Sequence, residues 1–160
     1  MSKRLEIEKY GLHNYDDYLC LRPPWLLIPS LIFLCRGLVV YVLVGVSGGV
    51  PEGFNDIVDT ETFWSGSLAA APATLVLYAR IARVPTAPAF ARWAWRHGRA
   101  LTSLSALSYV AIAVAQWGSD PRRWLGSPLA AKAMVLAELT IIAYLFLSAR
   151  VRQAFLDFPE

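Results

Sequence analysis

Long apolar runs, separated by short polar segments, dominate the chain. Four of these runs are long enough to cross a lipid bilayer as helices, because that distance needs about 20 apolar residues. In hydrocarbon every backbone N–H and C=O group must be bonded within the protein, which favours helices. The pattern therefore predicts an all-α, polytopic membrane protein with four transmembrane helices, at about residues 25–47, 63–82, 100–117 and 128–148.

The predicted spans divide the chain into three parts. Residues 1–24 form a lead-in, residues 25–148 form the four-helix transmembrane domain, and residues 149–160 form a tail. Pro29 and Pro72 fall inside spans. Because proline removes a backbone donor and crowds the preceding turn, we expect these two residues to kink their helices.

Positive charge is distributed unevenly between the two sides of the predicted domain. Eleven Lys and Arg residues belong to the lead-in, to the segment joining the second and third spans, and to the tail. The opposite side carries only Arg122 and Arg123, and its first loop is acidic between Glu52 and Glu61. Since cytoplasmic loops are enriched in Lys and Arg, this asymmetry predicts that both termini are cytoplasmic.

The composition agrees with a protein that lies mostly in lipid. The chain is 56% hydrophobic and 17% charged, whereas soluble domains carry about 25% charged residues. Its formal net charge of +3 does not indicate nucleic-acid binding, because the basic residues flank the apolar runs. We therefore expect membrane lipids, and other membrane-protein subunits or a second copy of the chain, as partners, and no nucleic acid.

Two ionisable residues of opposite sign lie near the middle of predicted spans. Arg36 follows Trp25 by 11 residues, and Glu138 follows Pro128 by 10 residues from the other side of the membrane. Placing a charge at the centre of a spanning helix costs about 2.5–3.5 kcal/mol on insertion scales. We therefore predict an intramembrane ion pair between Arg36 and Glu138. It either fixes helix packing only, or serves as a proton site or a contact to a partner subunit.

Small residues recur at helical spacing in the second span. Gly66 is followed by Ala70 and Ser67 by Ala71, each four positions later. Such pairs let helix backbones approach closely in lipid. We interpret these four residues as helix-packing positions, with packing inside the bundle as their main use.

The segment before the third span combines basic and aromatic residues. Arg92, Arg96 and Arg99 form one stripe when the segment is read as a helix, and Trp93 and Trp95 accompany them. This combination is typical of a helix that lies against anionic lipid. We predict that these five residues form a lipid interface.

Recognisable catalytic and cofactor motifs are absent from the sequence. It has no Cys/His cluster with metal spacing, no phosphate loop and no nucleophile elbow. We therefore expect no catalytic residues, no metal and no cofactor. The expected function is that of a non-enzymatic accessory, assembly or stabilising subunit of a larger membrane complex. The alternative is a small oligomeric carrier or channel that uses Arg36 and Glu138.

Several short motifs resemble a known family. They are the lead-in YDDYLCLRPPW at Tyr15–Trp25, the internal arginine of FLCR at Phe33–Arg36, the FWxG that opens the second span, and the APA around Pro72. The chain resembles a family of small, uncharacterised inner-membrane proteins of gammaproteobacteria, a domain of unknown function, over about residues 16–107. The resemblance implies a multi-pass protein of the bacterial inner membrane and supplies no catalytic residues. The acidic loop departs from the family pattern.

Overall fold

A computed structural model describes residues 11–16, 18–46, 60–117 and 129–159. The acidic loop up to Asp59, and Arg122 and Arg123, lie outside these residues. The described part contains seven α-helices and no strand, which confirms the all-α class. In chain order the elements are the 3₁₀-helix η1 (Leu12–Asn14) and the α-helices α2 (Leu27–Leu34), α3 (Arg36–Val46), α4 (Thr60–Ile81), α5 (Ala89–Arg96), α6 (Gly98–Trp117), α8 (Leu129–Leu147) and α9 (Ala149–Leu156).

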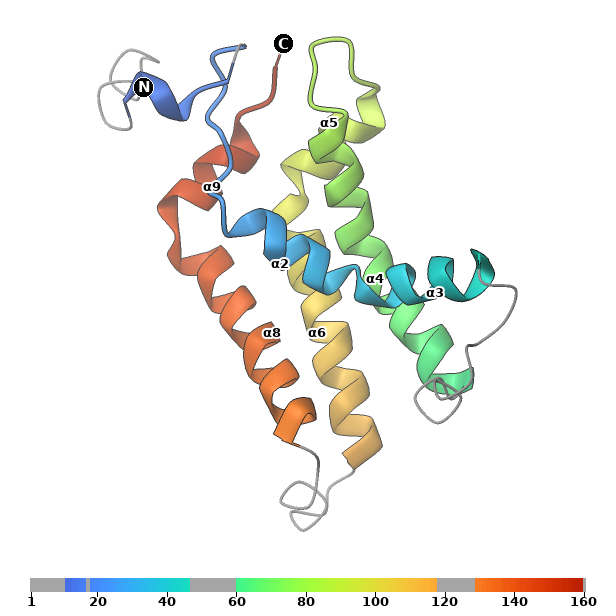
Figure 1. The fold of residues 1–160 in the computed structure, drawn as a ribbon. Coiled ribbons are helices and arrows are strands. Elements are labelled where there is room, and N and C mark those ends of the chain that lie inside the picture. The colour runs from blue at the N-terminus through green and yellow to red at the C-terminus, as the bar shows by residue number, and fades with distance from the viewer. Residues whose placement is uncertain (1–10, 17, 47–59, 118–128, 160) are drawn as a thin grey trace.

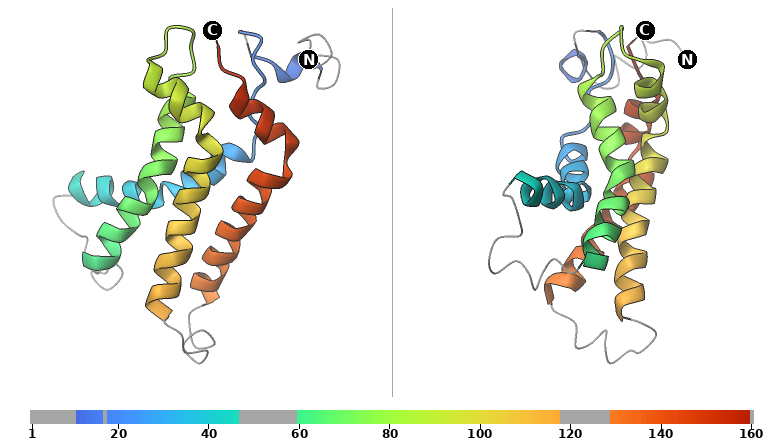
Figure 2. Two further views of the ribbon diagram at one scale, coloured as in Figure 1. Left: turned by 180° about the vertical axis from the view of Figure 1, so that it is seen from behind. Right: turned by 90° about the vertical axis from the view of Figure 1, so that its right-hand side faces the viewer.

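Three long helices, α4, α6 and α8, lie side by side with alternating direction (Figures 1 and 2). Of the helices described, two, α6 and α8, are long and apolar enough to cross a membrane. Small buried residues such as Ala70, Ala73 and Ala106 let the three helices approach closely. The hydroxyl of Ser105 on α6 donates a hydrogen bond to the backbone oxygen of Ala69 on α4, at 2.5 Å.

The segment predicted as the first span differs from that prediction. It forms two helices, α2 and α3, separated at Cys35, and they run across α4 and α6 instead of along them (Figure 1). Pro29 does not cause the break, because it lies in the first turn of α2, where a missing N–H costs little. Helix α4 likewise runs unbroken through Pro72. Length and composition therefore support two of the four predicted spans, those of α6 and α8.

Gly37 explains how α3 crosses α4. A Cβ atom added at Gly37 would collide with the backbone carbonyl of Gly66 and would stand 2.8 Å from the Tyr109 hydroxyl. Only a residue without a side chain fits at position 37. The break at Cys35 and the glycine after Arg36 together bring the backbone of α3 onto α4.

The short helices α5 and α9 gather at one end of the long helices, beside the lead-in (Figure 1). Trp95 on α5 donates a hydrogen bond to the carbonyl of Ala154 on α9 at 2.8 Å. The ring of Trp95 also lies 4.8 Å from that of Phe155. This end of the molecule therefore has a packed core of its own.

Candidate functional site

Arg36 and Glu138, the two mid-span charges, meet in the structure. A terminal nitrogen of Arg36, at the start of α3, forms an ion pair and a hydrogen bond with Oε1 of Glu138, in the middle of α8. The side chain of Glu138 is 2% exposed and that of Arg36 is 27% exposed. The pair therefore joins the crossing segment to the long helices at a buried position.

Aromatic rings enclose the Arg36 guanidinium on two sides. Its central carbon lies 3.8 Å from the ring centre of Tyr109 and 4.4 Å from that of Phe33. A second terminal nitrogen donates to the backbone oxygen of Phe33 at 3.1 Å. That bond adds a side-chain donor to a carbonyl at the end of α2, which also accepts from a backbone N–H at the C-cap. Cation–π contacts of this kind favour a charged guanidinium in an apolar environment.

Tyr109 is a member of the site that the sequence did not single out. Its hydroxyl donates to the carbonyl of Gly66 at 3.0 Å and accepts from the backbone N–H of Gly37 at 3.3 Å. The Tyr109 hydroxyl thus fixes the crossing of α3 and α4, while its ring packs against the Arg36 guanidinium. The available signal was a lone tyrosine within an apolar span, whose hydroxyl needs a partner when buried.

The second carboxylate oxygen of Glu138, Oε2, is buried and has no hydrogen-bond partner among the described residues. Glu138 also lines a pocket of about 240 Å³, which we call the central pocket. Its walls come from α3, α4, α6 and α8 and are formed by Arg36, Gly66, Tyr109, Ile112, Ala113, Gln116, Ala131, Met134, Val135 and Glu138.

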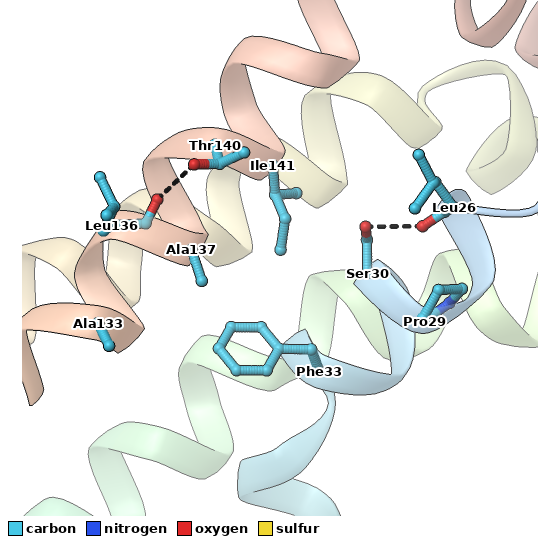
Figure 3. A pocket seen from close by; sticks show the side chains of 9 residues that line it. All are labelled: Leu26, Pro29, Ser30, Phe33, Ala133, Leu136, Ala137, Thr140 and Ile141. Atoms are coloured by element: carbon cyan, nitrogen blue, oxygen red, sulfur yellow. Dashed lines mark hydrogen bonds between the residues drawn. The ribbon is translucent and has the colours of Figure 1, made fainter. Parts of the chain in front are cut away.

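A second hollow, the α2–α8 groove, lies between α2 and α8 and is lined in part by Phe33 (Figure 3). Its volume is about 470 Å³. The hydroxyls of Ser30 and Thr140 bond to carbonyls of their own helices, at 2.8 and 2.7 Å, so the groove presents an apolar surface. It is lined by Leu26, Pro29, Ser30, Phe33, Ala133, Leu136, Ala137, Thr140 and Ile141.

Comparison with known proteins places the chain in a family. A model of the proteins of unknown function DUF2919 matches residues 10–157. The chain belongs to the DUF2919 family. No curated protein and no solved structure matches it. The family match extends beyond the lead-in and first two spans, where the resemblance was seen, and includes Glu138 and α9.

The small residues predicted to pack helices divide into two groups in this DUF2919 protein. Gly66 lies at the crossing with Gly37, Ala70 is fully buried, and Ser67 is 8% exposed. Ala71, in contrast, lies on the exposed side of α4. Ala71 therefore does not pack inside the molecule, and a packing role against another subunit stays a prediction.

The predicted lipid interface also needs a correction. Arg92, Trp93 and Arg96 are exposed on α5, whereas Trp95 is fully buried against α9 and cannot contact lipid. Arg99, on α6, donates to the carbonyl of Leu145 at 3.1 Å, near the end of α8. A cation at a helix C-terminus is favourable because it offsets the negative end of the helix dipole.

A buried arginine, Arg83, ties the lead-in to the tail. One terminal nitrogen donates to the carbonyls of Leu21 and Asp157, at 3.1 and 2.9 Å, and the other lies 3.6 Å from a carboxylate oxygen of Asp16. The Asp157 carboxylate accepts from the backbone N–H of Leu21 at 2.7 Å. We call Asp16, Leu21, Arg83 and Asp157 the terminal lock. The sequence placed Arg83 among the loop charges and gave no sign of these partners.

Burial and charge change the acidity of two groups at the terminal lock. Burial, with the negative charge of Asp157 as the next cause, raises the pKa of the Cys20 thiol to about 11. Burial lowers the pKa of Arg83, and the negative charge of Asp16 opposes that change. Cys20 is therefore a neutral thiol at physiological pH. In the described parts of the chain, no three His, Cys, Asp or Glu side chains lie close enough together to hold a metal ion.

Proposed function

We propose that this DUF2919 chain is a multi-pass protein of the bacterial inner membrane that acts as a non-enzymatic accessory or assembly subunit. Membrane insertion is supported by α6 and α8. Only 17% of the apolar window of α8 is buried inside the molecule, whereas the core helix of a soluble protein is mostly buried. The apolar outer surface of α8 suits lipid or another membrane helix.

The same proposal places the α5 end of the molecule at the cytoplasmic face. The exposed arginines of α5, together with Arg22 and Arg152, gather at that end with the lead-in and α9. Exposed Phe90 and Trp93 stack at 6.0 Å between ring centres. Aromatic rings beside arginines suit the headgroup region of an anionic leaflet. Single cysteines placed in the lead-in and the tail would remain unlabelled by an impermeant thiol reagent added to intact cells.

The observation that carries the accessory role is the exposed apolar surface of α3, which extends beyond α4 (Figure 2). Val42, Leu43 and Val46 are 57%, 60% and 83% exposed. A groove of about 310 Å³ between α3 and α4 has an apolar lining that includes Val42. A helix of another subunit can pack into this groove, because van der Waals packing drives helix association in lipid.

Mild detergent extraction tests this role. The tagged protein is expected to elute with a partner subunit in a fixed stoichiometry. Val42→Trp fills the groove and should lose that partner, whereas Leu104→Trp changes a residue of similar exposure on α6 and should retain it. Elution of the chain alone, or equal retention by both variants, contradicts the accessory role.

A second candidate, a small oligomeric carrier or channel, is favoured by one observation. Glu138 lines the central pocket, and its buried Oε2 has no partner among the described residues, as expected of a group that holds a transported proton or solute. Purified protein in sealed vesicles should then conduct protons or solute, and Glu138→Gln should abolish the flux. Vesicles that remain tight with the unmodified protein rule this candidate out.

A further inference from the structure

Glu138, which lines the central pocket, keeps one hydrogen-bond acceptor without a partner among the described residues. The residue is 1% exposed, Oε1 is occupied by Arg36, and Oε2 has no partner among the described residues. A buried acceptor without a donor costs about 1–3 kcal/mol, and more when the group is charged. A ligand that supplies one donor to Oε2 removes this cost.

Charge balance limits what that ligand can be. Arg36 and Glu138 form a neutral pair, so a bound cation or anion would leave a net charge buried among apolar side chains. The Arg36 guanidinium already has the carboxylate, the Phe33 carbonyl and two aromatic rings as partners. A neutral molecule with a single O–H or N–H donor therefore fits the pair better than an ion does.

The size and lining of the central pocket define the rest of the ligand. Its volume of about 240 Å³ is many times the ~30 Å³ that one water molecule occupies in the liquid. Ile112, Ala113, Met134 and Val135 give it apolar walls, and Tyr109 adds an aromatic ring. Small-molecule sites combine a mostly apolar lining with a few placed polar groups in this way.

We propose that the central pocket is a binding site for a small neutral, lipid-soluble molecule that donates one hydrogen bond to Glu138 Oε2 and packs an apolar or aromatic body against Tyr109, Ile112 and Val135. Hydroxylated aromatic rings are the class that meets all of these requirements. The inference goes beyond the accessory role, and it concerns occupancy of the pocket, which does not depend on transport.

Two isomeric probes test the proposal on the detergent-solubilised full chain. Para-propylphenol has a hydroxyl donor, whereas para-ethylanisole has the same atoms and no donor. The phenol should raise the midpoint of thermal unfolding in a saturable manner. Its affinity should exceed that of the ether by at least about tenfold, as expected for one hydrogen bond to a charged group.

Pocket-filling variants locate the effect. Ala113→Phe places a ring in the central pocket while Arg36 and Glu138 keep their side chains, and it should abolish the phenol-specific shift. Ala131→Leu, which fills the opposite wall, is a second variant in case the first does not fold. Ala133→Phe, on the α2–α8 groove, is the matched control and should leave the shift unchanged.

Three results overturn the proposal: equal shifts with both isomers, no saturable shift with either, or a phenol-specific shift that survives both pocket-filling variants. The readout is separate from the partner and flux experiments. Loss of the accessory role therefore leaves the binding result standing, and an empty pocket leaves the accessory role standing.

Discussion

Two arginines of this molecule have the same kinds of partner in different proportions. Arg83 is 5% exposed and donates to the backbone carbonyls of Leu21 and Asp157, with Asp16 at 3.6 Å and the ring centre of Trp95 at 5.1 Å. Arg36, whose side chain is 27% exposed, is held by one carboxylate, one backbone carbonyl and two aromatic rings beside a pocket. Backbone carbonyls from distant segments can be gathered only in one fold, so Arg83 serves the architecture. Arg36 instead neutralises a carboxylate that keeps one oxygen available for a ligand.

The largest loss of stability is expected when only one member of the Arg36–Glu138 ion pair is replaced. Glu138→Leu leaves Arg36 without its carboxylate and should lower the free energy of unfolding by about 3–5 kcal/mol. Adding Arg36→Met to Glu138→Leu should recover most of that loss, because no unpaired charge then remains buried. Denaturant titrations in one detergent measure both, and a double variant as unstable as the single one would contradict the pairing.

The next largest effect is expected at the terminal lock. Arg83→Met removes the donor from the carbonyls of Leu21 and Asp157, so we expect a loss of about 2–3 kcal/mol. Hydrogen exchange should accelerate in α9 and the lead-in while the middle of α8 stays protected. Arg83→Lys, which keeps the charge and a donor, should lose less. Uniform acceleration along the chain would show that the lock and the central site are one unit.

A smaller loss of stability should distinguish Gly37 from Gly66, the two glycines where α3 crosses α4. Gly37→Ala forces a methyl group against the carbonyl of Gly66 and should cost about 1–3 kcal/mol. Gly66→Ala is the matched control, since its new methyl meets nothing closer than the Tyr109 ring at 4.0 Å and alanine favours the helix. Thermal unfolding of both variants measures the difference, and equal stability would contradict the close approach.

The smallest effect is the pH dependence contributed by Cys20. Its pKa rises from 9.0 to about 11 on folding, so the unfolded chain loses this proton first as the pH increases. Cys20 should therefore reduce stability between pH 9 and about 11 and have no effect below that range. Comparing unfolding free energies of the unmodified protein and Cys20→Ala across this range isolates the contribution. Parallel curves for the two proteins would contradict it.

The positions of Arg36 and Glu138 near the middle of their apolar runs were enough to predict the ion pair between them. Arg36 and Glu138 are the two opposite charges near the middle of their segments, and burial of an unpaired charge is costly enough to bring them together. Periodicity likewise indicated the exposed arginines of α5. Both inferences depend on local sequence. The first uses the free-energy cost of burying an unpaired charge, and the second uses the helical repeat.

The rest of the site depends on contacts that local sequence does not encode. The break at Cys35 follows from interactions of Arg36 and Gly37 with other helices, and the apolar run around it is continuous. Trp95 was predicted to lie at the lipid interface with its exposed neighbours, because local sequence does not reveal that α9 packs against α5. Arg83 carries the same charge as other loop arginines, and only the meeting of lead-in and tail distinguishes it.

The bond between Leu21 and Asp157 joins residues 136 positions apart in the chain, and this separation has a consequence for biosynthesis. Leu21 is synthesised long before Asp157, so this bond forms only after the tail has been translated. Arg83, made midway, can already contact Leu21 and Asp16. The terminal lock is therefore completed only when α9 has emerged from the ribosome.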